Sequence, residues 1–293
     1  MSTSVNVDGT CSAFSVQQAA GVSRRPTLSV GVVTYRSDES ALFATLDSLA
    51  RAIEHAICAG TLAGAVVNVV DNGATLTGAA LSPLHRKEIQ AKLVLTQQNL
   101  GYGAGQNLAF QDAESDYHLV LNPDVFVSVD ALHNAIRWMD AHPSVVLLAP
   151  DVCDASGERS FLCRRMPGLL VLLLRGFAPR WVRHVFRRSL AWHEMRDVVD
   201  GKSVVWDPPV VGGCFMLFRS ASYSALDGFD RRYFLYFEDY DLSLRAASQG
   251  RIAYVPDVRI SHAGGGASRK GLRHILMFGR SALTFFRLHG WRV

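Results

Sequence analysis

Three acidic side chains directly follow a run of aromatic residues in the segment Phe234–Arg245. The acids are Glu238, Asp239 and Asp241, and they begin a helix that is expected to end near Gln249. A carboxylate in partly dry, aromatic surroundings can be tuned to act as a general base. The helix dipole also favours acids in a first helical turn, so the same pattern has a purely structural explanation.

Polar residues follow four expected strands at the points where those strands end. They lie in the segments Thr34–Tyr35–Arg36, Asp71–Asn72–Gly73, Asn99–Asn107 and Asn122–Pro123–Asp124. In open α/β sheets, ligands bind outside the carboxyl ends of the strands. Any one of these segments could be only a turn, but together they predict a cleft for a polar ligand.

Glycines alternate with other residues at Gly101, Gly103 and Gly105, after a strand and at the start of a helix. The next position is Gln106, so the G-x-G-x-x-G pattern of dinucleotide-binding proteins is not met. The glycines could simply let a helix and a strand pack closely. We favour close approach of the backbone to a nucleotide or a sugar, because the neighbouring strand ends face the same edge.

Two side chains are candidate ligands of Mg²⁺ or Mn²⁺. Asp124 projects from a turn that Pro123 makes rigid, and His262 comes shortly after a strand that is expected to end near Val255. These cations prefer oxygen ligands and often share them with substrate phosphates. A departing diphosphate requires such charge compensation. Taken alone, the Asn-Pro-Asp turn could only initiate a helix, and the histidine could be an ordinary loop residue.

Apolar strands alternate with amphipathic helices through most of the chain. Strands are expected at 28–34, 65–71, 92–96, 117–121, 145–149 and 251–255, and helices at 39–58, 82–90, 104–113 and 129–141. This alternation predicts an α/β fold with a doubly wound, mostly parallel sheet flanked by helices. We expect one domain over 27–265 with a basic helical insertion near 166–190, and a basic amphipathic helix over 266–293 packed on it.

Composition excludes several classes of protein. The 293 residues are 49% hydrophobic with a net charge of +4, so the chain can bury a large core. The longest apolar run near the middle, Leu169–Leu174, is far shorter than the roughly 20 residues that cross a bilayer. Five scattered cysteines without a C-x-x-C pair argue against a disulfide framework or a zinc site and favour the cytoplasm. Residues 1–26 lack a signal peptide's apolar segment and are expected to be a disordered leader.

Basic residues are concentrated between apolar ones in two stretches, 164–188 and 269–292. This combination favours contact with an anionic membrane surface. Aromatic residues among the arginines could also suit single-stranded nucleic acid, but no RNP or helix-turn-helix pattern supports that partner. Ordinary solvated helix faces remain the alternative.

The chain resembles the family 2 inverting glycosyltransferases of the GT-A fold, most closely their bacterial rhamnosyltransferase-like branch. The resemblance covers roughly residues 27–290. It rests on segments that occur in the family's order: Val32–Tyr35, Val69–Asn72, Asn99–Tyr102, Gly105–Asn107, Leu121–Val125, Val211–Gly213, Gly228–Asp230, Phe234–Arg245, Pro256 and Ile260–His262.

The resemblance implies a role for each candidate residue. Asp239 would be the catalytic base, with Glu238 beside it. Asp124 would hold a divalent metal (Mg²⁺ or Mn²⁺), and His262 would be a ligand of the metal or of a phosphate. Asn122 departs from the family's D-x-D motif because it is not acidic. The acceptor would lie near Gly212 and Gly213. The nucleotide sugar would contact Thr34, Tyr35, Arg36, Asp71, Asn99, Gly101, Gly103, Asn107, Asn122 and Asp124.

The resemblance also implies the substrates. The donor would be dTDP-β-L-rhamnose, with another dTDP-sugar or a UDP-sugar as the alternative. The expected acceptor is a lipid-linked saccharide at the cytoplasmic face of the inner membrane, used in cell-surface polysaccharide assembly, because the apolar run Leu169–Leu174 is followed by five arginines from Arg175 to Arg188. Two interpretations from other classes stay open at this point: a nicotinamide-dependent oxidoreductase, which rests on the glycine loop, and an inactive sugar-binding protein.

Overall fold

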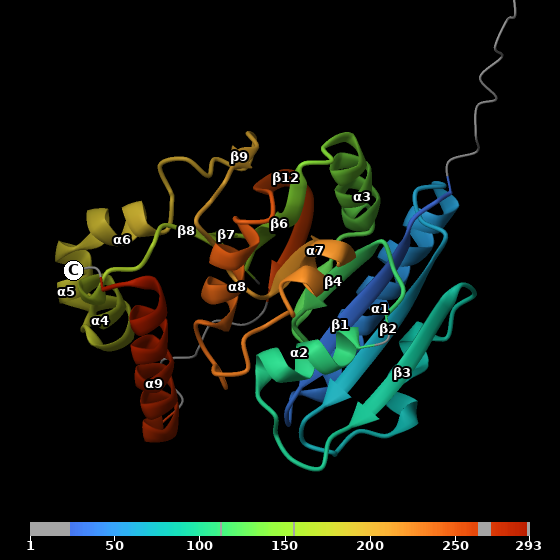
Figure 1. Cartoon of the computed structure of the whole chain (residues 1–293), viewed down its shortest axis with the longest axis horizontal. Coiled ribbons are helices and arrows are strands. Elements are labelled where there is room, and N and C mark those ends of the chain that lie inside the picture. The colour runs from blue at the N-terminus through green and yellow to red at the C-terminus, as the bar shows by residue number, and fades with distance from the viewer. Residues whose placement is uncertain (1–23, 112, 155, 263–270, 292–293) are drawn as a thin grey trace, which may run out of the picture.

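The computed structural model describes residues 24–111, 113–154, 156–262 and 271–291. One large sheet runs through it, in the strand order β3-β2-β1-β4-β11-β6-β12-β5 (Figure 1). The strands of this path are β1 (Thr27–Thr34), β2 (Gly64–Asp71), β3 (Ile89–Leu95), β4 (Tyr117–Leu121), β5 (Val125–Val127), β6 (Val145–Cys153), β11 (Phe215–Arg219) and β12 (Arg251–His262). The short strands are β7 (Arg159–Ser160), β8 (Cys163–Arg164), β9 (Val205–Trp206) and β10 (Val210–Val211).

Helices cover both faces of the sheet (Figure 1). They are α1 (Glu39–Cys58), the 3₁₀ helix η1 (Gly78–Leu84), α2 (Tyr102–Phe110), α3 (Ala131–Ala141), α4 (Leu169–Phe177), α5 (Arg180–Val185), α6 (Arg187–His193), α7 (Ser220–Ala225), α8 (Glu238–Ala246) and α9 (Gly271–His289). The strand β4 shows why both faces are covered: Leu119 and Leu121 belong to one buried cluster, and Val120 belongs to another. A strand that is apolar on both sides requires a layer on each face.

The sheet is mostly parallel, as the alternation of strands and helices predicted. β1 pairs in parallel with β2 and β4, and β2 pairs in parallel with β3. β11 is an exception, since it runs antiparallel to both of its neighbours, β4 and β6. The carboxyl ends of β1 to β4 therefore share one edge, and β11 begins at that edge.

Helix α1 follows directly from local sequence. Asp38 caps its N-terminus by accepting hydrogen bonds from the backbone N–H groups of Ser40 and Ala41. Leu42, Leu46 and further residues at the same helical spacing are buried against the sheet. The helix spans the residues expected of it.

Two predicted elements differ most from the structure in their boundaries. The helix expected at 82–90 is instead η1, which ends at Leu84, and the strand β3 already begins at Ile89. Pro83 lacks an N–H for a longer helix, and Glu88 has a φ of 62°, which breaks the chain direction before Ile89 pairs with β2. The strand expected at 251–255 continues to His262, with a register shift between Val255 and Arg259. Pro256 cannot donate to the sheet, so the strand bulges there and resumes.

The insertion and the C-terminal helix lie together at one end of the molecule, on the left in Figure 1. A buried cluster joins Leu172 of α4, Phe285 and Phe286 of α9, and Tyr240 of α8. Within the described residues, no helix combines the length and the apolar character that crossing a bilayer demands. Of the expected leader, residues 1–23 lie outside the described part, and Arg24 forms an ion pair with Asp116 at 2.7 Å.

Candidate active site

The ends of β1 and β2 form the first part of the site. Thr34 and Asp71, the last residues of these strands, are paired in register, and both are buried. The backbone N–H of Asn72 donates to the Thr34 carbonyl at 2.9 Å, which continues the pairing by one step. After Thr34 the chain turns outward: Tyr35 is 48% exposed, and the Arg36 guanidinium lies 5.4 Å from the centre of its ring.

The Asp71 carboxylate organises the loop after β2. It accepts hydrogen bonds from the backbone N–H groups of Gly73, Thr75 and Leu76, at 2.8, 2.6 and 2.8 Å. A buried carboxylate with these donors is satisfied within the chain. Asp71 therefore holds the loop that follows β2 at this edge of the sheet, and its direct contact with a nucleotide stays a prediction.

The glycine loop is explained by packing within the chain. A Cβ on Gly101 would lie 2.4 Å from the Phe234 carbonyl oxygen, and one on Gly103 would lie 2.8 Å from the Phe229 Cβ. Gly101 also has a φ of 88°, which favours glycine. Because these positions have no side chain, the loop at 228–234, which is distant in sequence, can pack directly against α2. Nucleotide binding by Gly101 and Gly103 is thus not needed to explain the spacing, and it stays a prediction.

Asparagines fasten the same loops. Asn99 Oδ1 accepts from the Gly101 N–H at 2.9 Å, and Asn72 Nδ2 donates to the Gly101 carbonyl at 3.0 Å. Asn107 Oδ1 accepts from the Phe229 N–H, and its Nδ2 donates to the Phe229 carbonyl. The amide of Asn107 thus holds the 228–234 loop, and the nucleotide contacts proposed for Asn99 and Asn107 remain predictions.

Asp124 and His262 lie side by side although 138 positions separate them. The antiparallel pairing of β5 with β12 places His262 opposite Val125, and His262 Nε2 lies 3.1 Å from Asp124 Oδ1. The Thr45 hydroxyl donates to the Pro123 carbonyl at 2.9 Å, which fixes the turn before Asp124. The two residues predicted to share a metal are therefore adjacent.

This pair fits a divalent cation as a partial set of ligands. A carboxylate oxygen and an imidazole nitrogen at one point are suitable donors for Mn²⁺, and substrate phosphates usually complete such a shell. The described residues contain no group of three or more His, Cys, Asp or Glu side chains that could hold a metal by themselves. Residues 263–270, which follow His262, are outside the described ranges.

Asp239 lies at the N-terminus of α8 and is held by two backbone donors. Its Oδ2 accepts from the Gly213 N–H at 2.9 Å, and its Oδ1 accepts from the Tyr240 N–H at 2.9 Å. The side chain is half-buried. Burial raises the pKa of the Asp239 carboxyl above its usual range, and the nearby Arg164 charge and the Gly213 N–H partly offset that rise. A carboxylate of raised pKa is suited to accept a proton.

The backbone just before Asp239 is strained. Tyr236 and Phe237 have φ values of 72° and 64°, in the left-handed region that bulky residues rarely adopt. Strain of this kind persists where the surrounding packing enforces it. Here Phe237 is buried against Phe278 and Phe285 of α9, so the aromatic run before the acids positions the start of α8.

Glu238 and Asp239 have different surroundings. Glu238 is 6% exposed, and its buried Oε2 has no hydrogen-bond partner among the described residues. Burial, with a smaller contribution from the Asp239 charge, raises the pKa of Glu238 to about 8. Of the two acids, Asp239 has the better access to a substrate, and a direct catalytic role for Glu238 stays a prediction.

The segment at 213–214 connects Asp239 with the turn that carries Asp124. Gly213 binds Asp239, and the Cys214 carbonyl accepts from the Asn122 N–H at 2.9 Å. Burial raises the pKa of the Cys214 thiol to about 12, and the charges of Asp124 and Asp239 add to that rise. Both carboxylates thus act on the same residue, so the sites predicted at 122–124, 213 and 239 adjoin one another. Gly212, the other predicted acceptor residue, is buried beside Leu162.

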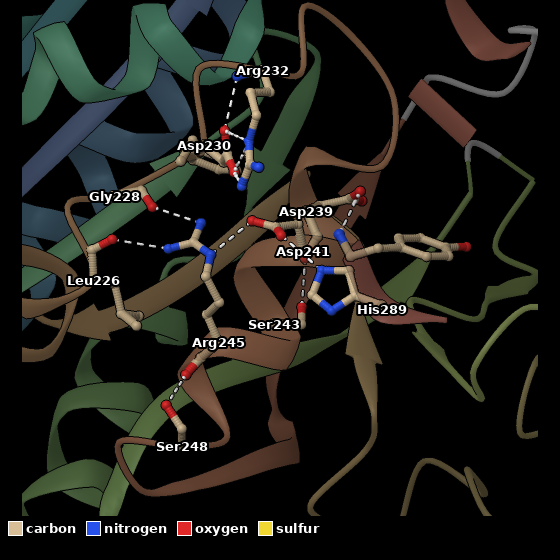
Figure 2. A network of polar contacts seen from close by, with 12 residues as sticks. Leu226, Gly228, Asp230, Arg232, Asp239, Asp241, Ser243, Arg245, Ser248 and His289 are labelled. Atoms are coloured by element: carbon tan, nitrogen blue, oxygen red, sulfur yellow. Dashed lines mark hydrogen bonds and ion pairs between the residues drawn. The ribbon is translucent and has the colours of Figure 1, made fainter. Parts of the chain in front are cut away.

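The third acid of the segment has a structural role. Asp241 is buried between α8 and α9, where its Oδ2 accepts from Arg245 Nε at 2.7 Å and its Oδ1 lies 2.8 Å from His289 Nε2 (Figure 2). Arg245 also donates to the carbonyls of Leu226 and Gly228. This network anchors the helix that carries Asp239.

Two contributors to the site were missed from the sequence. The Tyr102 hydroxyl donates to the carbonyl of Gly213 at 3.0 Å, the same residue whose N–H binds Asp239. Arg164 lies beside α8, where its Nη1 donates to the Tyr240 hydroxyl at 2.8 Å. Tyr102 stood within the Asn99–Tyr102 segment, so a signal existed. Arg164 was counted only as one of many basic residues.

The sheet order, the carboxylate-histidine pair at its edge and the acid-bearing helix opposite define an α/β transferase of the GT-A class. The chain belongs to glycosyl transferase family 2, which it matches over residues 29–226. It is 31% identical to the N-acetylglucosaminyl-diphospho-decaprenol L-rhamnosyltransferase of Mycobacterium tuberculosis, over 77% of this chain and 76% of that protein. It is 28% identical to the rhamnosyltransferase WbbL of Escherichia coli K12, over 55% of this chain and 60% of that protein.

A solved structure supports the same fold. The mannosyltransferase PcManGT from Pyrobaculum calidifontis, in complex with GDP-Man and Mn²⁺, superimposes with a TM-score of 0.52 at 18% identity. The match covers 92% of this chain and 77% of that one. The predicted family and fold are therefore confirmed, and the protein is a glycosyltransferase. The oxidoreductase interpretation is wrong, because the family differs and packing accounts for the glycines on which it rested.

Proposed function

We propose that this protein is an inverting rhamnosyltransferase that moves L-rhamnose from dTDP-β-L-rhamnose onto a saccharide carried by a polyprenyl diphosphate. The names of the two bacterial relatives support the sugar, and the name of the mycobacterial one supports the acceptor class. The observation that carries the reaction is the position of Asp239. Its side chain is half-buried, its pKa is raised, and it lies near Cys214, as Asp124 does.

In the proposed reaction, Asp239 takes the proton from an acceptor hydroxyl. The hydroxyl oxygen attacks the anomeric carbon and forms the new glycosidic bond, while the bond from that carbon to the diphosphate breaks. dTDP leaves with the electron pair, and the β configuration of the donor becomes α. An in-line displacement of this kind requires the base on the side of the sugar opposite the diphosphate.

Asp124 and His262 are proposed to hold a divalent cation, Mg²⁺ or Mn²⁺, beside the donor. When bound, the cation neutralises charge on the departing diphosphate. The mannosyltransferase and its Mn²⁺ support a metal for this fold. The strand-end residues Thr34, Tyr35, Arg36, Asp71 and Asn122 are proposed to line the nucleotide pocket, and Gly212 and Gly213 the acceptor side.

The protein is proposed to work in the cytoplasm, in peripheral contact with the inner membrane, during cell-surface polysaccharide assembly. Large apolar side chains are exposed on the two basic segments: Trp181 is 72% exposed, Val185 70% and Leu276 72%. Arginines 183, 187, 188, 273, 280 and 287 are exposed among them. Exposed apolar and cationic side chains interleaved along a segment suit an anionic lipid headgroup region.

A donor panel tests the proposal. The release of nucleotide is measured from dTDP-rhamnose, UDP-glucose, UDP-N-acetylglucosamine and GDP-mannose, with and without N-acetylglucosaminyl-diphospho-farnesol and Mn²⁺. We expect dTDP release from dTDP-rhamnose only when the acceptor is present, with an α-rhamnosyl product by NMR. Faster release from a UDP-sugar would overturn the donor, and a β-linked product would overturn inversion.

A further inference from the structure

Arg164 is a half-buried arginine beside the proposed base, and the nearby charges of Asp239 and Glu194 favour its charged form. Its Nη1 donates to the Tyr240 hydroxyl at 2.8 Å, and its guanidinium lies 6.0 Å from the centre of the Tyr240 ring. Its Nε is fully buried and has no hydrogen-bond acceptor in the described part of the chain. Burying a guanidinium N–H without an acceptor is costly. Arginines kept in such positions commonly serve to bind an anion.

The neighbouring arginine shows the contrast. Arg165 forms a two-pronged ion pair with Asp197, with both N–O distances at 2.8 Å, and stacks on the Trp192 ring at 4.6 Å. Its charge is therefore satisfied within the protein. The two adjacent arginines thus differ: Arg165 forms an ion pair with a carboxylate, whereas the hydrogen bond of Arg164 goes to the Tyr240 hydroxyl.

The location of Arg164 is rigid relative to Asp239. Arg164 is paired in register with Val210, two residues before Gly212, and the Gly212 N–H donates to the Leu162 carbonyl at 3.0 Å. The Ser243 hydroxyl of α8 accepts from the Val211 N–H at 3.1 Å and donates to the Asp239 carbonyl at 2.7 Å. The short β8–β10 sheet and the base-bearing helix therefore form one unit.

Beyond Arg164 the chain leads directly to an exposed apolar surface. Helix α4 begins five positions later, and Leu169, Leu170 and Leu173 on it are 40, 47 and 49% exposed. Met166 and Leu172, on the inner side, pack in the cluster that contains Tyr240 and Phe285. Asp239, Arg164 and helix α4 are thus connected through Tyr240, which follows Asp239, binds Arg164 and packs in the cluster with Leu172.

We propose that Arg164 binds the diphosphate of the acceptor, so that the acceptor lies along this line with its hydroxyl at Asp239 and its hydrocarbon chain at α4. The inference rests on the proposed lipid-linked acceptor. A sugar joined through a diphosphate to a polyprenyl chain presents the same three chemical groups in the same order. The donor also has a diphosphate, but in-line attack places that leaving group away from the base, on the side of Asp124 and His262.

The experiment compares two acceptors that differ only in the diphosphate. One is N-acetylglucosaminyl-diphospho-farnesol, and the other is the farnesyl glycoside of N-acetylglucosamine. For the Arg164→Gln variant we expect KM for the first acceptor to rise about 10- to 100-fold, the loss of a charged hydrogen bond. KM for the second acceptor and for dTDP-rhamnose is expected to change less than threefold. Arg165→Gln is the matched control, and its acceptor preference is expected to remain that of the wild type.

Two results would overturn the proposal. A variant that loses affinity for dTDP-rhamnose but keeps its acceptor preference would assign Arg164 to the donor. An equal loss with both acceptors would show a structural role. Arg164→Lys keeps the charge but not the planar set of donors. Its KM for the diphosphate acceptor is expected to lie between those of the wild type and Arg164→Gln.

A binding measurement separates this inference from the proposed function. Calorimetry with farnesyl diphosphate, farnesol and dTDP requires no turnover. If the wild type transfers no rhamnose to either acceptor, the proposed function fails, yet binding of farnesyl diphosphate in preference to farnesol, lost in Arg164→Gln, still supports the arginine's role. Equal binding of farnesyl diphosphate by wild type and variant overturns it.

Discussion

The Gly213 N–H donates to Asp239 Oδ2 at 2.9 Å, although the two residues are 26 positions apart. This hydrogen bond fixes the Asp239 carboxylate relative to the strand β11, which runs between β4 and β6 in the middle of the sheet. The same backbone segment contacts Asn122 through the Cys214 carbonyl. The segment Gly213–Cys214 thus relates the position of Asp239 to the turn that carries Asp124.

Asp239→Asn is expected to lower kcat by about 10²- to 10⁴-fold, because the amide cannot accept the acceptor's proton. The side chain keeps its size and can still accept from the Gly213 N–H, so the dissociation constant of dTDP should stay within about threefold of the wild-type value. Nucleotide release and calorimetry measure the two quantities. Asp257→Asn, an exposed carboxylate on β12, is the control. Wild-type turnover in Asp239→Asn would refute the assignment of the base.

Gly213→Ala tests the placement of the same carboxylate. The added Cβ would lie 3.1 Å from the Asp239 Cβ, so the base must move by a few tenths of an ångström. Small displacements of a catalytic group are costly, and we expect kcat to fall by about tenfold with little change in dTDP affinity. Gly279→Ala, whose Cβ would enter open space on α9, should leave kcat unchanged. Unchanged kcat in Gly213→Ala would mean that this contact does not set the base.

Much of the fold could be predicted because it depends on local pattern. In the run 65–71, valines lie on both faces of the strand, and the spacing of Leu42, Leu46 and Leu49 is that of one helix face. The polar strand ends could be predicted to meet because parallel strands finish at the same edge. Asp124 and His262 are adjacent for a less local reason, the pairing of β5 with β12.

The remainder depends on partners that are distant in sequence. The glycines at 101 and 103 fit the loop at 228–234, and nothing near them in the chain reveals that loop. Arg164 and Arg165 are identical in type, and only the fold gives Asp197 to one and the vicinity of Asp239 to the other. The antiparallel direction of β11 likewise depends on pairing across the sheet.

Glu238→Gln is expected to change how stability depends on pH. The usual pKa of a glutamate is near 4.5, and burial raises that of Glu238 to about 8. Between these values the unfolded chain releases a proton that the folded chain retains, so the free energy of unfolding falls as pH rises. Glutamine removes this dependence, and the variant should gain stability relative to wild type from pH 5 to pH 8.5 in urea denaturation. Glu39→Gln, at an exposed position, should show no such trend; a difference that is constant with pH would contradict the buried carboxyl.

Asp124→Asn is expected to weaken Mn²⁺ binding in the presence of dTDP by about 10- to 100-fold, since a neutral amide is a poorer ligand than a carboxylate. His262→Ala should also weaken Mn²⁺ binding. Titration of Mn²⁺ by electron paramagnetic resonance measures bound and free metal directly, and excess EDTA should stop turnover. His85→Ala, an exposed histidine after η1, should bind Mn²⁺ as the wild type does. Equal Mn²⁺ affinity in all three variants would place the metal elsewhere.

Leu276→Glu is expected to reduce binding to vesicles that contain anionic lipid. The leucine is 72% exposed on α9, between Arg273 and Arg280, and a glutamate there removes apolar contact while adding repulsion from the headgroups. Flotation with phosphatidylglycerol vesicles should recover several-fold less of this variant than of wild type. Phe43→Glu is the matched control, because Phe43 is 54% exposed on α1, at the other end of the molecule from α9 (Figure 1). Equal recovery of wild type with anionic and with neutral vesicles would refute an electrostatic contact, and equal losses in the two variants would show that flotation reports general hydrophobicity instead of this surface.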